Sequence, residues 1–541
     1  MSFFFASLSP SDRRSGSPGR LFGCTPALFL LLCLCSASAS RAASIVISNG
    51  DGQIVSIGDT ATWDTVTVEG TDGLSRSTYS ILGTLTVTGP GTPASVALFD
   101  QGLLDIAAGG TVTATGYADV TTGGTLQVNG LASFTDGVFA YQGGQVTIGA
   151  SGSLSGASLY LSGAGSFARS AGGTYSVTDL SLADGATANV TAADTVSGDV
   201  LVDSLAVLTL AGNLSIPSTK TLYLAGGGSI SRTTQSISVG TLDVAADSSF
   251  TLAASDSVGA LLLHGGGQAT VGTPLSLTGL TVTGSSAGGT PSSLTATDTL
   301  SITSAGSILV SSGGLLAATG GITGDGATTI SVTGDSSRLV VAGASGIDTT
   351  TIDAGGVLET TAGTFVTDTL SLSGPGAFVR TAGGYDASHL QLSDTSLSYT
   401  AADTVAVEAA LSNGASLSIS KNLALSGNLL LDGGSALTRS SGTETVAAAG
   451  LFLSGASSFA IKAGDSFSTL DLATGGSATT ASALALSSLT IDAGSALTLQ
   501  AFDGTQGSLT WGLRVDGNQQ TLLARSEEHT SELQSRQYLV C

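Results

Sequence analysis

The stretch Leu159-Tyr160-Leu161-Ser162-Gly163-Ala164-Gly165-Ser166-Phe167-Ala168-Arg169 returns as Leu370-Ser371-Leu372-Ser373-Gly374-Pro375-Gly376-Ala377-Phe378-Val379-Arg380. Each copy opens on a Leu-x-Leu pair. Apolar pairs of this kind recur about every 20 residues: the pair that begins at Leu159 is followed by one at Leu180, and the same holds for Leu222 and Leu242, Leu370 and Leu390, and Leu429 and Leu451. Apolar residues at alternate positions predict short strands that are buried on one side. A repeat of about 20 residues indicates a solenoid, in which each coil buries its apolar row against the next coil.

Runs bounded by glycine show the strand pattern most clearly. Gly110-Thr111-Val112-Thr113-Ala114-Thr115-Gly116 and Gly124-Thr125-Leu126-Gln127-Val128-Asn129-Gly130 alternate polar and apolar residues, and no segment has convincing helical periodicity. A β-propeller would carry blade signatures, and β-sandwich domains would bring linkers and more aromatic residues than the 5% present. The sequence therefore predicts an all-β chain: a single right-handed parallel β-helix (β-solenoid) of about 20–25 residues per coil over residues 43–500.

A longer unit is superimposed on the coil period. Four arginines end related stretches, and each is followed by an aspartate slightly more than one coil later, in the pairs Arg169/Asp194, Arg232/Asp256, Arg380/Asp403 and Arg439/Asp465. We expect the arginines at equivalent corners of the solenoid, with each aspartate on the neighbouring coil. The spacing allows a contact between the two charges without requiring it, and a surface ion pair would contribute at most about 1 kcal/mol. The arginines are interpreted as register or corner residues and not as a binding site.

The N-terminal segment has the order of a secretory signal peptide. A basic region containing Arg13, Arg14 and Arg20 precedes a short apolar core at 26–35 and the small residues at 36–39. Residues 1–42 are therefore predicted to be a signal peptide, with cleavage after Ala39 or Ala42. The apolar core is shorter than the roughly 20 residues that span a membrane, which argues against an uncleaved anchor.

The C-terminal segment differs from the rest of the chain. Residues 525–541, beginning Arg525-Ser526-Glu527-Glu528-His529, resemble a translated sequencing adapter. Residues 1–39 and 525–541 are expected to pack little against the solenoid, because the first is a removable export signal and the second has no evolved reason to fold onto it. The natural C-terminus is then expected to be missing, which makes residues 501–524 either a terminal cap or the start of a truncated C-terminal region.

Charge and cysteine content limit the function classes. The formal net charge is −23, which makes nucleic acids and anionic membrane surfaces poor partners, and direct membrane insertion of the repeat region is not expected. Cys24, Cys33 and Cys35 lie in the predicted signal peptide and Cys541 lies in the adapter-like segment. The mature chain therefore has no thiol for a disulfide, a metal site or a nucleophile.

Candidate sites for chemistry are few. His264 and His389 each lack a second ligand at metal-binding spacing, so each is interpreted as a turn or strand residue. The segment Gly320-Gly321-Ile322-Thr323-Gly324-Asp325-Gly326 is similar to one calcium-binding β-roll repeat but occurs once, whereas that site needs tandem copies. No catalytic, cofactor-binding or metal-binding residue is predicted, and no cofactor is expected.

In repeat style, residues 44–500 resemble the β-helical passenger regions of Gram-negative autotransporters and, more closely, exported bacterial repeat proteins with a PEP-CTERM sorting tail. Trp511-Gly512-Leu513-Arg514-Val515-Asp516-Gly517-Asn518-Gln519 resembles the segment that lies shortly before such a tail. The resemblance implies an exported protein at the cell surface or outside a Gram-negative-type bacterium. We expect a non-catalytic structural or adhesive repeat protein whose partners are extracellular glycans or other surface proteins. The alternative is a β-helix polysaccharide lyase or glycoside hydrolase that acts on extracellular glycans, which would need clustered carboxylates and a basic residue in one groove.

Overall fold

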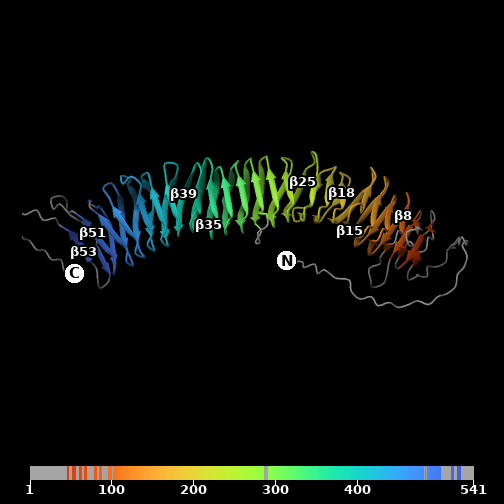
Figure 1. The fold of residues 1–541 in the computed structure, drawn as a ribbon, viewed down its shortest axis with the longest axis horizontal. Helices are drawn as coiled ribbons and strands as arrows, with labels where there is room; N and C mark the ends of the chain where they lie inside the picture. The colour runs from red at the N-terminus through yellow and green to blue at the C-terminus, as the bar shows by residue number, and fades with distance from the viewer. Residues whose placement is uncertain are drawn as a thin grey trace, which may run out of the picture. The chain divides into compact units, whose positions relative to one another are not determined.

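The computed structural model describes residues 102–500 without 285–289, 481 and 483, together with short strands between residues 45 and 99, at 513–516 and at 521–525. The predicted signal peptide lies outside the described residues. So does the adapter-like segment, apart from Arg525 at the end of the last strand. In the described part the chain is all β, contains no α-helix, and stacks parallel strands into a β-solenoid of about 20 coils. This confirms the predicted fold class, and the coils follow one another in chain order (Figure 1).

Each coil supplies three strand segments, which we call the first, second and third segments. One coil shows them as separate strands: β9 (Thr111–Ala114), β10 (Tyr117–Val120) and β11 (Thr125–Val128). In many later coils the first and second segments join into one long bent strand, as in β15 (Ser153–Ser162). The first half of β15 pairs with β12 and its second half pairs with β13, so one hydrogen-bonded sheet wraps around two faces of the solenoid.

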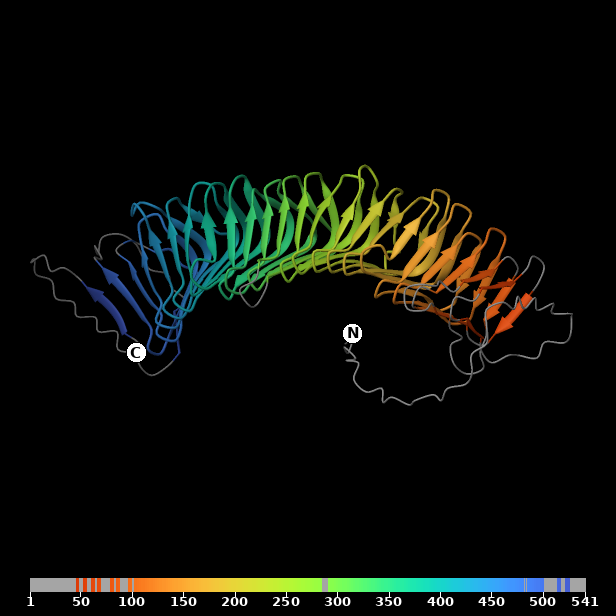
Figure 2. The same ribbon diagram turned by 45° about the vertical axis from the view of Figure 1, so that its right-hand side comes forward.

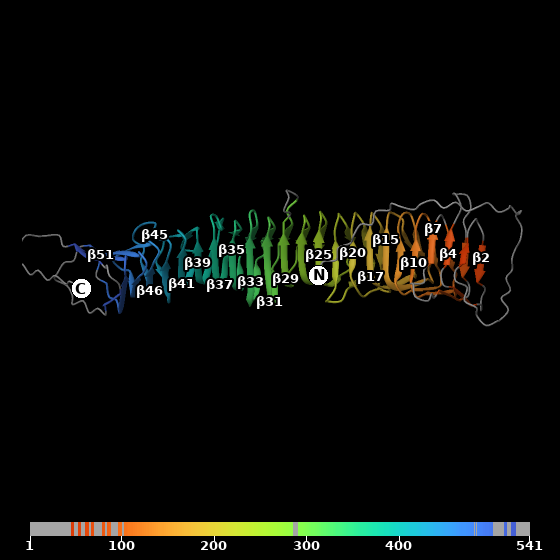
Figure 3. The ribbon, with the colours of Figure 1, turned by 90° about the horizontal axis from the view of Figure 1, so that it is seen from below.

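The first and second segments form this sheet, in which strands of neighbouring coils lie side by side (Figure 2). The view from below shows its labelled strands in chain order, for example β25, β29, β31 and β33 (Figure 3). Besides β9, β10 and β15, its strands are β1 (Ile45–Ile47), β3 (Thr60–Trp63), β4 (Val66–Glu69), β6 (Thr84–Val87), β7 (Val96–Phe99), β12 (Leu131–Phe134), β13 (Gly137–Ala140), β17 (Thr174–Ala183), β19 (Thr195–Val196), β20 (Val200–Val202), β22 (Leu214–Ser215), β23 (Thr221–Leu224), β25 (Ile237–Ala245), β27 (Ser257–His264), β29 (Leu275–Thr283), β31 (Leu300–Ser311), β33 (Ile322–Thr333), β35 (Ala344–Asp353), β37 (Thr364–Ser373), β39 (Gly384–Ser393), β41 (Thr404–Ser412), β43 (Leu423–Ala424), β44 (Asn428–Leu431), β46 (Val446–Leu453), β48 (Ser466–Leu472), β50 (Ser488–Asp492) and β52 (Leu513–Asp516).

The third segments form five separate sheets, one after another along the solenoid. The first sheet contains β2 (Gly52–Val55), β5 (Thr78–Ile81), β8 (Leu103–Ile106), β11, β14 (Gln145–Ile148) and β16 (Phe167–Arg169). The second contains β18 (Thr187–Val190), β21 (Val207–Leu210) and β24 (Ser229–Ser231). The third contains β26 (Ser249–Leu252), β28 (Gln268–Val271), β30 (Ser293–Ala296), β32 (Leu315–Ala318), β34 (Arg338–Val341), β36 (Val357–Thr360) and β38 (Phe378–Arg380). The fourth contains β40 (Ser396–Tyr399), β42 (Ser416–Ile419) and β45 (Ala436–Arg439), and the fifth contains β47 (Ser458–Ile461), β49 (Ser477–Thr480), β51 (Ala496–Gln500) and β53 (Thr521–Arg525).

The Leu-x-Leu pairs lie in the second segments and stack directly on one another. Leu159 pairs with Leu180, and the same holds for the other predicted pairs, Leu222/Leu242, Leu370/Leu390 and Leu429/Leu451. Both leucines of each pair point inward and are almost fully buried, so the second segments contribute a continuous row to one apolar core.

The length of a coil varies along the solenoid. Ser238 pairs with Ser257 in one short coil, whereas Val66 pairs with Val96 in a long one. The long coil exceeds the predicted length, because its connections between strands are longer. Residues 88–95 connect β6 to β7 there, while residues 115–116 connect the equivalent strands β9 and β10.

A small residue occupies the corner between the second and third segments. At one such corner the Gly144 N–H donates to the carbonyl oxygen of Tyr141, three residues earlier. A Cβ atom on Gly144 would lie 1.9 Å from the carbonyl oxygen of Val120 on the preceding coil. Glycine therefore allows two coils to approach closely here, which fixes the turn at Tyr141 and Gln142.

The four predicted arginine–aspartate pairs all form between neighbouring coils. They are Arg169–Asp194 at 2.5 Å, Arg232–Asp256 at 2.5 Å, Arg380–Asp403 at 2.7 Å and Arg439–Asp465 at 2.5 Å. Each arginine lies at the end of the last strand of a third-segment sheet or directly after it, and each aspartate follows the first strand of the next sheet. The arginines thus occupy equivalent places, as predicted, and each pair joins two sheets where the third-segment ladder is interrupted.

The assumption that these would be surface pairs is wrong. The side chains of all four aspartates are fully buried, and Arg169 and Arg439 are only 2% and 6% exposed. Two backbone N–H groups donate to each carboxylate: at Asp403 these are the N–H of Thr400 in its own turn and the N–H of Tyr385 on the preceding coil. An aromatic ring also covers each guanidinium, for example the ring of Phe250, whose centroid lies 5.0 Å from Arg232 Cζ. The sequence spacing could not show this burial, because it depends on the interrupted ladder.

Two tyrosines at equivalent positions in these clusters differ in their hydroxyl groups. Tyr175 Oη donates to the carbonyl oxygen of Asn189 at 3.1 Å, whereas Tyr385 Oη is buried and has no hydrogen-bond partner among the described residues. We expect Tyr175→Phe to lower the free energy of unfolding by about 1 kcal/mol, because it removes the hydrogen bond to the carbonyl oxygen of Asn189. Tyr385→Phe should leave that free energy unchanged or raise it slightly. Chemical denaturation of the two variants checks this, and equal losses would contradict it.

Candidate functional site

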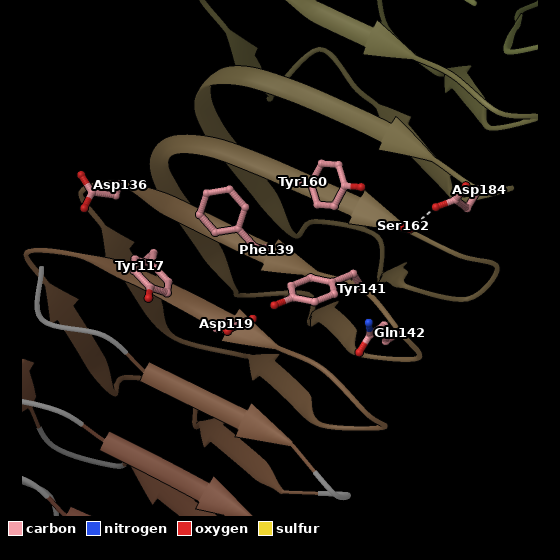
Figure 4. Close-up of a pocket in the computed structure, with 9 residues that line it drawn as sticks. All are labelled: Tyr117, Asp119, Asp136, Phe139, Tyr141, Gln142, Tyr160, Ser162 and Asp184. Carbon is pink, nitrogen blue, oxygen red and sulfur yellow. Dashed lines mark hydrogen bonds between the residues drawn. The ribbon is translucent and has the colours of Figure 1, made fainter. Parts of the chain in front are cut away.

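An open groove lies on the outer face of the second segments near the N-terminal end of the described coils. Its cavity volume is about 670 Å³. We call it the aromatic groove and define it by its nine lining residues, which are Tyr117, Asp119, Asp136, Phe139, Tyr141, Gln142, Tyr160, Ser162 and Asp184. They come from three successive coils and the turn after a fourth strand, as Figure 4 shows.

Four aromatic residues line the groove, and three of them come from three neighbouring strands, one from each. Tyr117 belongs to β10, Phe139 to β13 and Tyr160 to β15. The Tyr117 and Phe139 ring centroids lie 5.9 Å apart with the ring planes at 85°, and those of Phe139 and Tyr160 lie 6.5 Å apart at 38°. Successive side chains of a strand point to opposite faces. The residues on either side of Phe139 and Tyr160 are buried in the core, so these two rings point outward. The coil-to-coil stacking therefore sets the distance between the rings.

Polar groups flank the rings on both sides. Asp119 is directly opposite Phe139 in the ladder between β10 and β13. Its Oδ1 atom is buried and has no hydrogen-bond partner among the described residues. At the far end Ser162 Oγ donates to Asp184 Oδ2 at 2.6 Å. The groove thus combines apolar ring faces with carboxylate oxygens, one of which, Asp119 Oδ1, has no hydrogen-bond partner among the described residues.

The Tyr141 hydroxyl points toward Asp119 (Figure 4). Partial burial, followed by the hydrogen bond with the Asp119 side chain and by its negative charge, raises the pKa of Tyr141 to about 12. The phenol is therefore neutral at physiological pH and can donate a hydrogen bond. These causes disfavour the phenolate, since burial removes water and the carboxylate places a negative charge beside it.

This shift gives a pH prediction. A pKa that is higher in the folded chain contributes stability that is fully present below pH 10 and is lost as the pH rises from about 10 to 12. We expect the tyrosinate absorbance of the wild-type chain, minus that of Tyr141→Phe, to show a component titrating near pH 12. A difference curve centred near pH 10 would show that Tyr141 is not held in this environment.

The groove brings together carboxylates but no basic residue. Asp119, Asp136 and Asp184 line it, and none of its nine lining residues is a lysine or an arginine. A β-helix enzyme acting on acidic glycans needs carboxylates together with a cation that handles the charge of the substrate. The arrangement instead suits a ligand with apolar faces and hydroxyl groups.

The other candidate residues do not meet in this groove. His264 Nε2 lies 2.9 Å from Asp243 Oδ1, and burial raises the pKa of Asp243, partly offset by His264. His389 Nδ1 lies 3.7 Å from Asp368 Oδ2. In the segment 320–326, the Asp325 carboxylate accepts hydrogen bonds from the N–H groups of Ala305 and Ala327, which lower its pKa. Within the described part of the chain no group of three or more His, Cys, Asp or Glu side chains could hold a metal ion.

Sequence reasoning missed the aromatic groove, although a signal for it exists. Tyr117, Phe139 and Tyr160 recur in the sequence at close to the coil period, and Phe139 pairs directly with Tyr160. Tyr160 also occupies the central position of a Leu-x-Leu pair, which points outward when both leucines point inward. Aromatic residues that recur at the coil period therefore predict a ladder on the surface.

Comparison with known proteins adds no family assignment: no family model matches the chain, and no curated protein matches it. Among the described residues, no helix has the length and apolar character needed to cross a membrane.

Proposed function

We propose that the chain is an exported, acidic, non-catalytic surface repeat protein with a structural or adhesive role, in a Gram-negative-type bacterium. The solenoid supports this proposal, because about 20 coils present one repeated outer face and the apolar core continues through them. The single observation that carries the adhesive role is the aromatic groove, which offers aromatic rings and one carboxylate oxygen without a hydrogen-bond partner among the described residues. The similarity in repeat style to autotransporter passengers and PEP-CTERM proteins, together with the order of residues 1–42, supports export.

Export is tested with the full chain in a Gram-negative host. We expect the protein to leave the cytoplasm with a new N-terminus at Ser40 or Ala43, read by N-terminal sequencing after cell fractionation. A variant with Leu30 and Leu31 changed to aspartate, which breaks the apolar core of the predicted signal, should stay unprocessed. An unprocessed wild-type chain in the cytoplasm would overturn the export part of the proposal.

The carboxylates of the groove favour one second candidate, a glycoside hydrolase or lyase acting on extracellular glycans. Asp119, Asp136 and Asp184 supply oxygens that acid–base chemistry on a neutral glycan would need. Incubation of the full chain with neutral and acidic polysaccharides separates the two candidates. We expect no new reducing ends and no unsaturated products. Cleavage that is lost in Asp119→Asn or Asp136→Asn would replace the adhesive proposal by the enzymatic one.

A further inference from the structure

We propose that the aromatic groove binds a neutral glycan that lies along the solenoid axis and crosses the coils of β10, β13 and β15. This inference rests on the proposed function and names its ligand class. Rings from successive coils stand at intervals set by the stacking of parallel strands, about 4.8 Å per coil. That step is close to the length of one sugar ring in an extended glycan. Phe139 and Tyr160, whose ring planes meet at 38°, can therefore face neighbouring units, while Tyr117 meets the Phe139 ring edge-on and closes that end of the row.

The chemistry of the groove matches both sides of a sugar. The C–H face of a pyranose is apolar and stacks on an aromatic ring, while the hydroxyl groups at its edge donate hydrogen bonds. Asp119 Oδ1 is a buried acceptor without a partner among the described residues, and it lies opposite Phe139 in the ladder. A sugar unit on the Phe139 ring therefore has an acceptor for its hydroxyl groups beside it, which satisfies an oxygen that is otherwise costly to bury.

The charge of the groove decides against acidic glycans. Its three charged side chains are all aspartates, and the whole chain carries a formal net charge of −23. A uronate or sulfated sugar would meet like charges at both ends of the groove, at Asp119 and Asp184, without a lysine or arginine among the nine lining residues to offset them. A neutral glycan meets no such repulsion.

A protein partner is the other class of ligand, and the groove suits it less well. A protein that inserts an apolar side chain between the rings would leave the buried Asp119 Oδ1 atom without a donor. Sugars bring several hydroxyl donors for each ring that they cover. A metal ion is not favoured either, since the described residues contain no cluster that could hold one.

The same surface provides a matched control for the experiment. Tyr223 occupies the central position of another Leu-x-Leu pair, in β23, and is connected to Tyr160 through the ladder by Ser181 and Leu201. Its side chain is 40% exposed, and it lies outside the groove. Tyr223→Ala therefore removes an outward ring of the same kind from the same row while leaving the groove intact.

The test is titration calorimetry of the full chain with neutral hexasaccharides of glucose, N-acetylglucosamine and xylose, and with oligogalacturonate as the acidic probe. We expect at least one neutral hexasaccharide to bind, oligogalacturonate not to bind, and the disaccharide of the bound series to bind more weakly. Tyr160→Ala and Phe139→Ala should each weaken binding about tenfold or more, which corresponds to about 1.4 kcal/mol. Tyr223→Ala should bind as the wild type does. Circular dichroism checks that every variant keeps the wild-type fold.

Two results would overturn the inference. One is the absence of binding by every neutral hexasaccharide, including the case in which only a protein or only the acidic probe binds. The other is an equal loss in Tyr160→Ala and Tyr223→Ala, which would place the binding elsewhere. Neither result affects export or the lack of cleavage, so the ligand class can fail while the proposed function stands. Cleavage of a bound neutral hexasaccharide would instead overturn the non-catalytic proposal and leave the ligand class intact.

Discussion

Replacing Asp194 by alanine should destabilise the coils around it by about 3–5 kcal/mol, the cost of leaving one charge of a buried pair without its partner. The Asp194 carboxylate accepts hydrogen bonds from Arg169 and from the backbone N–H groups of Tyr175 and Thr191. The variant leaves all these donors unpaired, with Arg169 only 2% exposed. Arg169→Met should cost less, because the carboxylate then keeps its two backbone donors.

Guanidinium chloride denaturation and hydrogen exchange measure this effect. Exchange should accelerate at the amides of Tyr175 and Thr191 in Asp194→Ala, since these amides lose their acceptor. Glu359→Ala provides the matched control: it breaks the pair with Arg338, which is 49% exposed, and should cost under about 1 kcal/mol. Similar losses in Asp194→Ala and Glu359→Ala would show that burial does not give the cross-coil pair its strength.

Phe365→Ala should lower the free energy of unfolding by about 3–5 kcal/mol, because it removes a large side chain from a core that cannot collapse around the gap. Phe365 is fully buried in β37 and stacks between Ala344 on the preceding coil and Tyr385 on the next one. A cavity at this position therefore loosens contacts on both neighbouring coils, and each coil relies on those contacts for its stability.

The neighbouring residue provides the control for this core prediction. Val366 points outward from the same strand and is 36% exposed, so Val366→Ala should change the free energy of unfolding by less than about 0.5 kcal/mol. Thermal and denaturant unfolding of the two variants measure the difference. A small loss in Phe365→Ala would mean that the coils repack around the missing ring.

The sequence predicts the solenoid well because the core is periodic. Leu159, Leu180 and their counterparts must point inward in every coil, so their spacing reports the coil length directly. The burial of Arg169 and Asp194 could not be predicted in the same way. It depends on the interruption between β16 and β18, which leaves space for a guanidinium between two coils. Local spacing carries no information on that interruption.

The aromatic groove was harder to predict, for a different reason. The three rings of the row point outward, at Tyr117, Phe139 and Tyr160. Core packing does not select the residue type at such positions, so aromatic residues that recur there are hard to distinguish from a random occurrence. The carboxylates come from different places in their coils: Asp119 from a strand, and Asp136 and Asp184 from turns. Their convergence follows from the stacking of whole coils and from the turn geometry, neither of which the period alone specifies.

The interrupted third-segment ladder has a mechanical consequence. If the chain is pulled from its C-terminal end, coils should peel away one at a time until a buried arginine–aspartate cluster resists the force. The interval from Arg169 to Arg232 is similar to that from Arg380 to Arg439, whereas the interval between Arg232 and Arg380 is more than twice as long. When fully stretched, the chain measures about 200 Å from Arg169 to Arg232, about 500 Å from Arg232 to Arg380 and about 200 Å from Arg380 to Arg439. Single-molecule force spectroscopy should therefore record extension steps in a short–long–short order. Between the steps, the force should rise until the next arginine–aspartate cluster breaks.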